Sequence, residues 1–209
     1  MKSKTYVPQR LLNDRPGKYA DRVGRRYAES STAAYKKKYG QDKKWSGKLV
    51  PVKLADGTIV KLSPGKHNAV HVGVIEQFAP RFAPGSIVFY LGGTSQKNLI
   101  LDKQHLDGLG LSLCDHNKLS DVVLFDPKKK RLFLIEAVPS HGPMTPKRVH
   151  ELSRMFQKAD AGLVFVSALP DFNEFTRHSM KLAWKTHVWI AEFPDHMIHY
   201  NGDKFLGPR

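Results

Sequence analysis

Two apolar runs joined by a charged turn constrain the fold of this 209-residue chain more than any other feature of its sequence. The runs are VVLF at 122–125 and LFLI at 132–135, and the segment between them, DPKKKR, combines a proline with three lysines. Short apolar runs bounded by turn residues are typical of buried strands. The pattern predicts a β-hairpin that is apolar on both faces, and we expect helices to cover both faces of its sheet.

The register of this hairpin sets two acids opposite each other. If Asp126 pairs with Arg131 across the turn, Asp121 pairs with Glu136 at the other end of the hairpin. Opposed residues point to the same face, with Cβ atoms about 4.5–5.5 Å apart, and like charges there destabilise the sheet. A shared proton, a cationic partner or a bound metal ion relieves such repulsion. Because Mg²⁺ takes one or two carboxylates and fills its other positions with water and phosphate oxygens, the pair is a candidate Mg²⁺ site.

A register shifted by one residue gives a second interpretation of the same acids. Asp121 is then an ordinary acid at the start of a strand, and Glu136 is a salt-bridge partner of Arg131, Lys147 or Arg148. Periodicity defines the ends of strands only to within about two to four residues. The spacing therefore leaves both interpretations open.

Basic residues are concentrated at the N-terminal end of the chain, whose net charge is +15. Residues 1–48 contain 14 Lys and Arg against 4 Asp and Glu, whereas the remaining 161 residues contain 20 against 15. We therefore divide the chain into a basic arm, 1–48, and a domain, 49–209. Such an arm favours a nucleic-acid partner over an anionic membrane, or over a solvated tail that only aids solubility. Lys36, Lys37 and Lys38, which lie between tyrosines, suit contacts with phosphates and bases.

Other features of the sequence argue against membrane and secreted classes. No run of about 18 apolar residues is present, and the first residues contain no apolar signal segment, so we expect neither a membrane span nor secretion. The single cysteine, Cys114, cannot form an internal disulfide, which fits a reducing, cytoplasmic compartment. We expect a cytoplasmic protein with no membrane partner and no small-molecule cofactor.

Strand-like and helix-like segments surround the central hairpin. Asp56-Gly57 marks a short hairpin, and apolar residues at 70, 74, 75 and 78 predict a helix that Pro80 and Pro84-Gly85 bring to an end. Thr145 and Pro146 predict the start of a second helix. Further strands are predicted at 161–169 and 187–193. Together the segments predict an α/β or α+β domain with a mixed sheet of about five to seven strands flanked by helices.

Three stretches of the sequence, in their order along the chain, resemble the BsuBI/PstI family of type II restriction endonucleases. They are LSPGKHN at 62–68, EQFAPRFAPGSIVFYLGGTSQK at 76–97, and SDVVLFD…FLIEAVPSHGPMTPKR at 120–148. The resemblance is to the C-terminal catalytic domain of that family and runs from about residue 50 to the end of the chain. It implies the PD-(D/E)XK nuclease fold, whose core is a four-stranded mixed sheet flanked by helices.

The resemblance also implies roles for individual acids. Asp121 matches the Asp of the "PD" element, Glu136 matches the second acid, and both would be Mg²⁺ ligands. Glu76 stands where many members of the fold carry an additional acid, although the same residue is open to interpretation as a solvated helix residue.

Three positions depart from the family or fold pattern. Ser120 stands where the family usually has proline, and Gly93 where an Asp is expected in a YLGDT motif. Val138 stands where the fold generally has a lysine, a position at which the family lacks lysine too. Another group must therefore supply positive charge near the reacting phosphate.

Several residues are candidates for that role and for DNA contact. Lys147 is the first candidate for the positive charge and Lys97 the second, while His141 is a candidate for proton transfer because its ordinary pKa lies near neutrality. Lys97 and Arg148, in or beside the loop motifs GGTSQKN and SHGPMTPKR, are also predicted to contact DNA. Members of the family have a longer N-terminal region associated with DNA recognition, whereas this sequence has only the 48-residue basic arm before the domain. These loops would therefore have to read the DNA sequence in the major groove.

The leading interpretation is a Mg²⁺-dependent endonuclease of the type II restriction class that cuts double-stranded DNA. A homodimer is expected because palindromic sites match two-fold symmetry. One alternative is a non-catalytic DNA-binding protein on a degenerate nuclease fold, which Gly93 and Val138 support. Another is a structure-specific or nicking nuclease whose basic arm holds DNA without reading its sequence.

Overall fold

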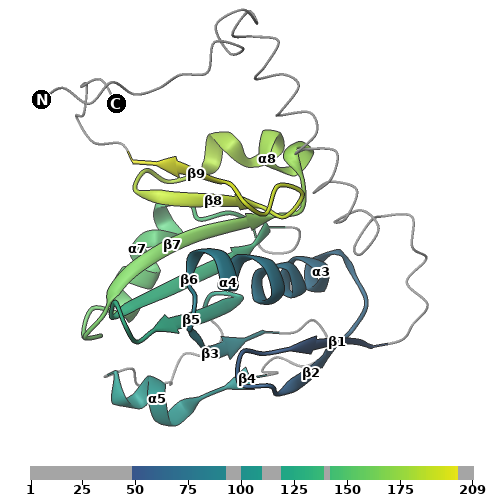
Figure 1. Ribbon diagram of the computed structural model, residues 1–209. Coiled ribbons are helices and arrows are strands. Elements are labelled where there is room, and N and C mark those ends of the chain that lie inside the picture. The colour runs from purple at the N-terminus through teal and green to yellow at the C-terminus, as the bar shows by residue number, and fades with distance from the viewer. Residues whose placement is uncertain (1–48, 93–99, 110–118, 139–141, 202–209) are drawn as a thin grey trace, which may run out of the picture.

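A central β-sheet with helices on both faces makes up most of the domain in the computed structural model (Figure 1). The structure describes residues 49–92, 100–109, 119–138 and 142–201. The basic arm with Lys36, Lys37 and Lys38 lies outside the described residues. So do Gly93, Lys97, Cys114 and His141.

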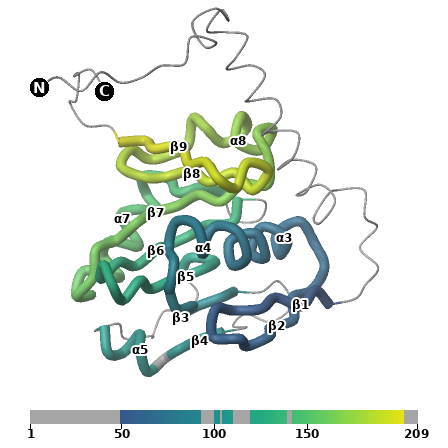
Figure 2. Tube along the Cα trace, viewed as in Figure 1, coloured from purple at the N-terminus to yellow at the C-terminus, as the bar shows by residue number. Residues whose placement is uncertain are grey.

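The central sheet has seven strands in the order β4-β3-β5-β6-β7-β8-β9, so the predicted mixed sheet is confirmed (Figure 2). Its strands are β3 (Ile87–Leu91), β4 (Ile100–Leu101), β5 (Val122–Asp126), β6 (Arg131–Ala137), β7 (Gly162–Leu169), β8 (Thr186–Ile190) and β9 (Met197–Tyr200). Strands β6, β7 and β8 run parallel to one another, and the other neighbouring pairs are antiparallel. The parallel strands are joined through helices, as parallel connections require.

The hairpin of β5 and β6 has the predicted register. Asp126 pairs with Arg131 beside the turn, and the pairing continues to Val122 opposite Ile135. Asp121 directly precedes β5, and Glu136 is the next residue of β6 after Ile135. The two acids therefore lie together at the end of the hairpin away from the lysine turn.

Both faces of this hairpin are buried, as its double apolar pattern predicts. One face packs against α3 (Lys66–Gly73) and the π-helical turn η1 (Val74–Phe78), and the other against α7 (Pro146–Met155). On the α3 face the buried hairpin side chains are Val122, Leu124, Phe133 and Ile135. On the α7 face they are Val123, Leu132 and Leu134. Burying one such side chain contributes roughly 1.5–3 kcal/mol, so this alternation fixes the register and with it the positions of the acids.

The helix that Pro80 and Pro84-Gly85 were predicted to close continues past Pro80 through α4 (Ala79–Phe82) and ends just before Pro84, so the prediction was wrong for Pro80 only. The π-helical turn explains the difference. The Ala79 N–H donates to the Val74 carbonyl, five residues back, and Pro80 falls in the first turn of α4. A proline has no N–H to donate, and the first turn of a helix needs none.

The remaining elements lie around this core. Strands β1 (Val50–Lys53) and β2 (Ile59–Leu62) form the predicted hairpin, in which Gly57 has a φ of 87°. Helix α5 (Lys103–Gly108), helix α8 (Phe172–His178) and the 3₁₀ turn η3 (Ser179–Lys181) complete the described chain. Among the described residues, no helix is both long enough and apolar enough to span a bilayer.

Candidate active site at the end of the central hairpin

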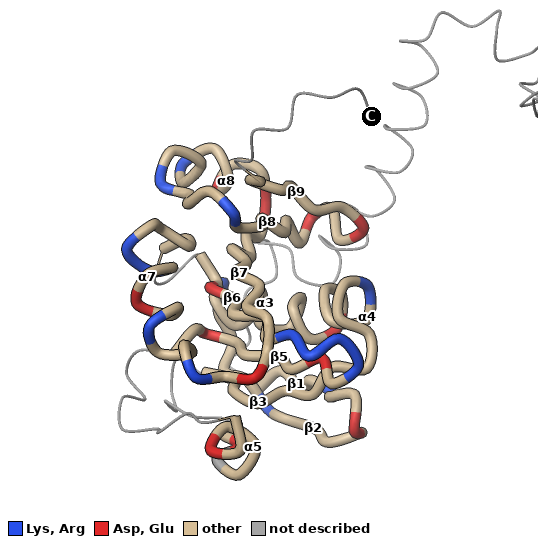
Figure 3. Tube along the Cα trace, turned by 90° about the vertical axis from the view of Figure 1, so that its left-hand side faces the viewer, with Lys and Arg blue, Asp and Glu red and all other residues tan. Residues whose placement is uncertain are grey.

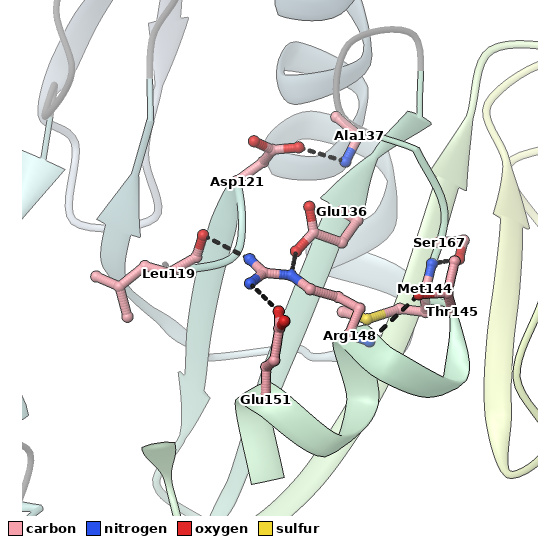
Figure 4. Close-up of polar contacts among 9 residues, drawn as sticks. All are labelled: Leu119, Asp121, Glu136, Ala137, Met144, Thr145, Arg148, Glu151 and Ser167. Atoms are coloured by element: carbon pink, nitrogen blue, oxygen red, sulfur yellow. Dashed lines mark hydrogen bonds and ion pairs between the residues drawn. The ribbon is translucent and has the colours of Figure 1, made fainter. Parts of the chain in front are cut away.

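Asp121 is held at the end of the hairpin by the backbone of the opposite strand. The Ala137 N–H donates to Asp121 Oδ2 at 2.8 Å (Figure 4). The Gly92 N–H donates to the Asp121 carbonyl at 2.9 Å, so the residue is tied to strands on both sides. A Cβ on Gly92 would lie 3.3 Å from Tyr90 Oη and 3.5 Å from that carbonyl, which is why a glycine fits here.

Glu136 is buried, and Arg148 is its ion-pair partner. The Glu136 side chain is only 4% exposed, and Arg148 Nε donates to its Oε1 at 2.8 Å. Arg148 Nη2 also donates to the Leu119 carbonyl at 2.9 Å, and Nη1 lies 3.6 Å from Glu151 Oε2 (Figure 4). One guanidinium thus joins β6, α7 and the segment that leads into β5. The hairpin thus has the register that places Asp121 beside Glu136, and Glu136 also forms the salt bridge with Arg148 that the second interpretation predicted.

The charge of Glu136 is strongly affected by its surroundings. Burial, and to a lesser extent the negative charge of Asp121, raise the pKa of its carboxyl from 4.5 to about 7, against the opposing effect of the Arg148 guanidinium, which lowers it. Burial also raises the pKa of the Tyr90 hydroxyl, and both acids add to that effect. The acidic pair therefore attracts positive charge beyond what Arg148 supplies.

The start of α7 sets the position of Arg148. The Met144 N–H donates to Ser167 Oγ on β7 at 2.9 Å, which attaches the chain to the sheet just before the helix. Thr145 is the predicted N-cap, and its Oγ1 accepts from the Arg148 N–H at 3.2 Å. These bonds place the first turn of α7 beside the end of β6, with Arg148 directed at Glu136.

The structure places the other predicted residues differently. Lys147 extends from α7 with its side chain 88% exposed and its Nζ 3.9 Å from Glu151 Oε1. Val138 is buried with Leu169, Val188 and Ile190, so an apolar side chain fills the position of the fold's general lysine. Glu76 lies in η1 and lines a pocket of about 510 Å³ between α4 and the end of β1. Its role as an additional acid stays a prediction.

Two histidines beside Asp121 are a part of the site that the sequence analysis did not identify. His67 and His71 lie one turn apart on α3, and both are buried. One ligand atom from each histidine and one carboxylate oxygen of Asp121 all lie within 4.8 Å of one another, close enough for the three residues to hold a metal ion. The only signal in the sequence is the four-residue spacing, which places both rings on one side of a helix.

A mixed sheet covered by helices on both faces, with two acids at the end of its central hairpin, defines the class of the domain as a PD-(D/E)XK nuclease fold. The solved structure of SdaI restriction endonuclease superposes with a TM-score of 0.72 and 42% sequence identity, over 77% of this chain and 50% of that one. A likeness of this extent confirms the fold that the motifs predict.

Sequence comparison identifies the family. The model of the BsuBI/PstI restriction endonuclease domain matches residues 50–203, and the chain belongs to this family. The type II restriction enzyme BsuBI of Bacillus subtilis is 42% identical over 159 residues, which are 76% of this chain and 50% of that protein. The type II restriction enzyme AplI of Arthrospira platensis is 34% identical over 185 residues, which are 85% of this chain and 56% of that protein. The chain spans about half the length of these relatives.

Proposed function

We propose that this chain is a Mg²⁺-dependent endonuclease that hydrolyses phosphodiester bonds in both strands of DNA, as a member of the type II restriction class. The observation that carries the proposal is the pair of acids, Asp121 and Glu136, fixed together at the end of the central hairpin. Family membership supports it, because the relatives that match the chain are type II restriction enzymes.

The acidic pair fits Mg²⁺. Proteins commonly bind Mg²⁺ through one or two carboxylates, and water and phosphate oxygens complete its coordination. The raised pKa of Glu136 reflects burial and uncompensated negative charge, both of which a divalent cation relieves. Bound there, Mg²⁺ would lower the pKa of a coordinated water and offset negative charge on the scissile phosphate.

Arg148 is the basic side chain that the site positions. Its guanidinium favours the ionised form of Glu136, which is the form that ligates a metal, and its hydrogen bond from Nε orients that carboxylate. We propose Arg148 as a positioning residue for Glu136. Lys147, the first candidate from the sequence, is directed away toward Glu151 and solvent. Lys97 and His141 keep their proposed roles in positive charge and proton transfer.

Double-stranded DNA is the proposed substrate and a homodimer the proposed assembly. Two identical subunits related by a two-fold axis match the symmetry of a palindromic site and place one active site on each strand. Lys36, Lys37 and Lys38 of the arm, together with Lys97, are proposed to contact phosphates. Arg148 forms an ion pair with Glu136. We therefore propose that it affects DNA cleavage by orienting that acid and not by contacting DNA itself.

Cleavage of supercoiled plasmid with and without Mg²⁺ tests the catalytic claim. The wild-type chain is expected to produce linear DNA only with the metal, and Asp121→Asn is expected to lower the rate at least about 100-fold through loss of a ligand. Asp160→Asn is the control for charge, because Asp160 is exposed and pairs only with the exposed Lys130 in the described residues. Intact DNA under all metal and salt conditions, with DNA binding retained, contradicts the proposal and favours the non-catalytic alternative.

Mapping the cut ends tests the restriction class. Discrete ends at a repeated sequence on both strands are the expected result. Scattered ends, or nicked circles that never become linear, favour the structure-specific or nicking alternative instead.

A further inference from the structure

Two histidines beside the acidic pair form, together with Asp121 of that pair, a cluster with the composition of a transition-metal site. His67 and His71 are 9% and 0% exposed, and their ring centroids are 4.1 Å apart. Asp121, which directly precedes β5, supplies the third ligand atom. The helix and the hairpin are far apart in sequence and meet here because α3 packs on the β5–β6 face.

The spacing of the ligand atoms is close to what one ion requires. Zinc binds imidazole nitrogen at about 2.0–2.1 Å and carboxylate oxygen at about 2.0–2.2 Å in tetrahedral geometry, so two ligand atoms of one ion lie about 3.4 Å apart. The three atoms of the cluster lie within 4.8 Å of one another. Side-chain shifts of about 1 Å therefore complete the geometry.

The chemistry of the ligands distinguishes this cluster from the acidic pair. Imidazole suits Zn²⁺, Ni²⁺ and Cu²⁺, whereas Mg²⁺ takes oxygen ligands. Two histidines four residues apart on one helix are also the arrangement that zinc-binding helices use. The Ala137 N–H fixes one oxygen of Asp121, which orients this carboxylate as outer partners orient metal ligands.

We propose that His67, His71 and Asp121 form a binding site for a divalent transition-metal ion, and that this site shares Asp121 with the acidic pair. An ion held there competes with Mg²⁺ for the carboxylate of Asp121. A transition-metal ion is therefore expected to inhibit Mg²⁺-dependent cleavage, a consequence that rests on the proposed nuclease function, whereas the binding itself does not.

Titration of the full chain with Co²⁺, without a polyhistidine tag, tests the binding directly. The visible absorption of bound Co²⁺ is expected to saturate at one ion per chain, and Zn²⁺ is expected to displace it. His67→Gln is expected to raise the Kd for Co²⁺ at least about 100-fold, because loss of a ligand costs at least as much as loss of an outer partner. His150→Gln, an exposed histidine on α7, is the matched control and is expected to leave the titration unchanged.

A second variant separates loss of a ligand from loss of the fold. His67→Cys keeps a metal-binding atom, so it is expected to bind Co²⁺ with a new sulfur-to-metal absorption band. Thermal unfolding of both variants without metal checks that they fold, and Co²⁺ is expected to raise the Tm of the wild-type chain and of His67→Cys but not of His67→Gln.

A third variant separates this inference from the proposed function. Glu136→Gln is expected to lose DNA cleavage and to keep the Co²⁺ spectrum, because Glu136 is not among the three ligands. If neither the wild-type chain nor His67→Cys binds Co²⁺, the inference is wrong even where cleavage is normal. Equal binding by wild type and His67→Gln also overturns it, and would direct attention to His187 and His199, whose Nδ1 atoms lie 2.8 Å apart.

Discussion

At the scale of single residues, the charge state of Glu136 affects both the stability of the fold and the proposed activity. Its folded pKa of about 7 exceeds the ordinary 4.5, so the folded chain binds this proton more tightly than the unfolded chain between those values. Stability contributed by protonated Glu136 is therefore present below about pH 4.5 and is lost as the pH rises through about 7.

Glu136→Gln tests this pH dependence, because the glutamine does not titrate. Relative to that variant, the wild-type chain is expected to lose up to about 3 kcal/mol of unfolding free energy between pH 4.5 and pH 7.5. Urea unfolding of both proteins across this range measures the difference. A difference that stays constant with pH would show that folding does not shift the pKa of Glu136.

Arg148 is the second residue whose removal has a predictable effect. Arg148→Met leaves the Glu136 carboxylate, 4% exposed, without its cation, and breaking a buried pair in this way typically costs about 3–5 kcal/mol. The loss is expected to be largest above pH 7 and smaller near pH 5, where Glu136 takes up a proton. Urea unfolding at the two pH values is the measurement.

Lys147→Met is the matched control for Arg148→Met. Lys147 is the neighbouring residue on the same helix, and its side chain is 88% exposed. Its substitution is expected to change the unfolding free energy by no more than about 0.5 kcal/mol at either pH. An equal loss in both variants would mean that the first turn of α7, and not the ion pair, accounts for the effect.

The residue-level site was predictable only where it follows from local sequence. The pairing of Asp121 with Glu136 could be deduced because the turn residues fix the register and both acids lie on the same hairpin. The approach of His67 and His71 to Asp121 could not, because it depends on how α3 packs on the sheet. The selection of Arg148 over Lys147 depends on the rotation of α7 about its own axis, which the cap and the buried Leu152 set.

At the scale of elements, α7 connects the core with the site. Its N-cap at Thr145 was predictable because a Thr-Pro pair at the start of a helical pattern has a specific mechanism. The π-helical turn between α3 and α4 was not predictable, because apolar residues at 70, 74, 75 and 78 have the spacing that a regular α-helix also gives. A proline inside that pattern predicts an end, and a widened turn lets the helix continue past it.

Thr145→Ala is expected to destabilise the domain by about 1 kcal/mol, because the N–H of Arg148 loses its acceptor at the start of α7. Thr145→Ser retains a hydroxyl and is expected to restore most of the loss. Thermal or urea unfolding measures the effect. If alanine and serine destabilise equally, the packing of the threonine methyl group matters more than the cap.

At the scale of the whole molecule, positive charge and the candidate site belong to different parts of the chain. The described residues contain 16 Lys and Arg and 13 Asp and Glu, a net charge of only +3, whereas the arm contributes +10. Basic and acidic residues are interspersed over the described domain rather than gathered in one band (Figure 3). The domain alone thus provides a weak electrostatic basis for holding DNA, and the arm a stronger one.

This division predicts how the salt dependence of DNA binding responds to substitution. Each phosphate contact contributes about −0.9 to the slope of log K against log salt concentration on duplex DNA. If Lys36, Lys37 and Lys38 each neutralise one phosphate, changing all three to Gln is expected to make the slope less steep by about 2.7.

Changing Lys128, Lys129 and Lys130 to Gln removes the same net charge from an exposed turn at the far end of the hairpin from the acids, and is expected to leave the slope nearly unchanged. Binding of the full chain to one duplex, measured over a series of salt concentrations with Ca²⁺ in place of Mg²⁺, gives both slopes. Equal changes in the two variants would mean that net charge acts at long range, and that the arm makes no phosphate contacts of its own.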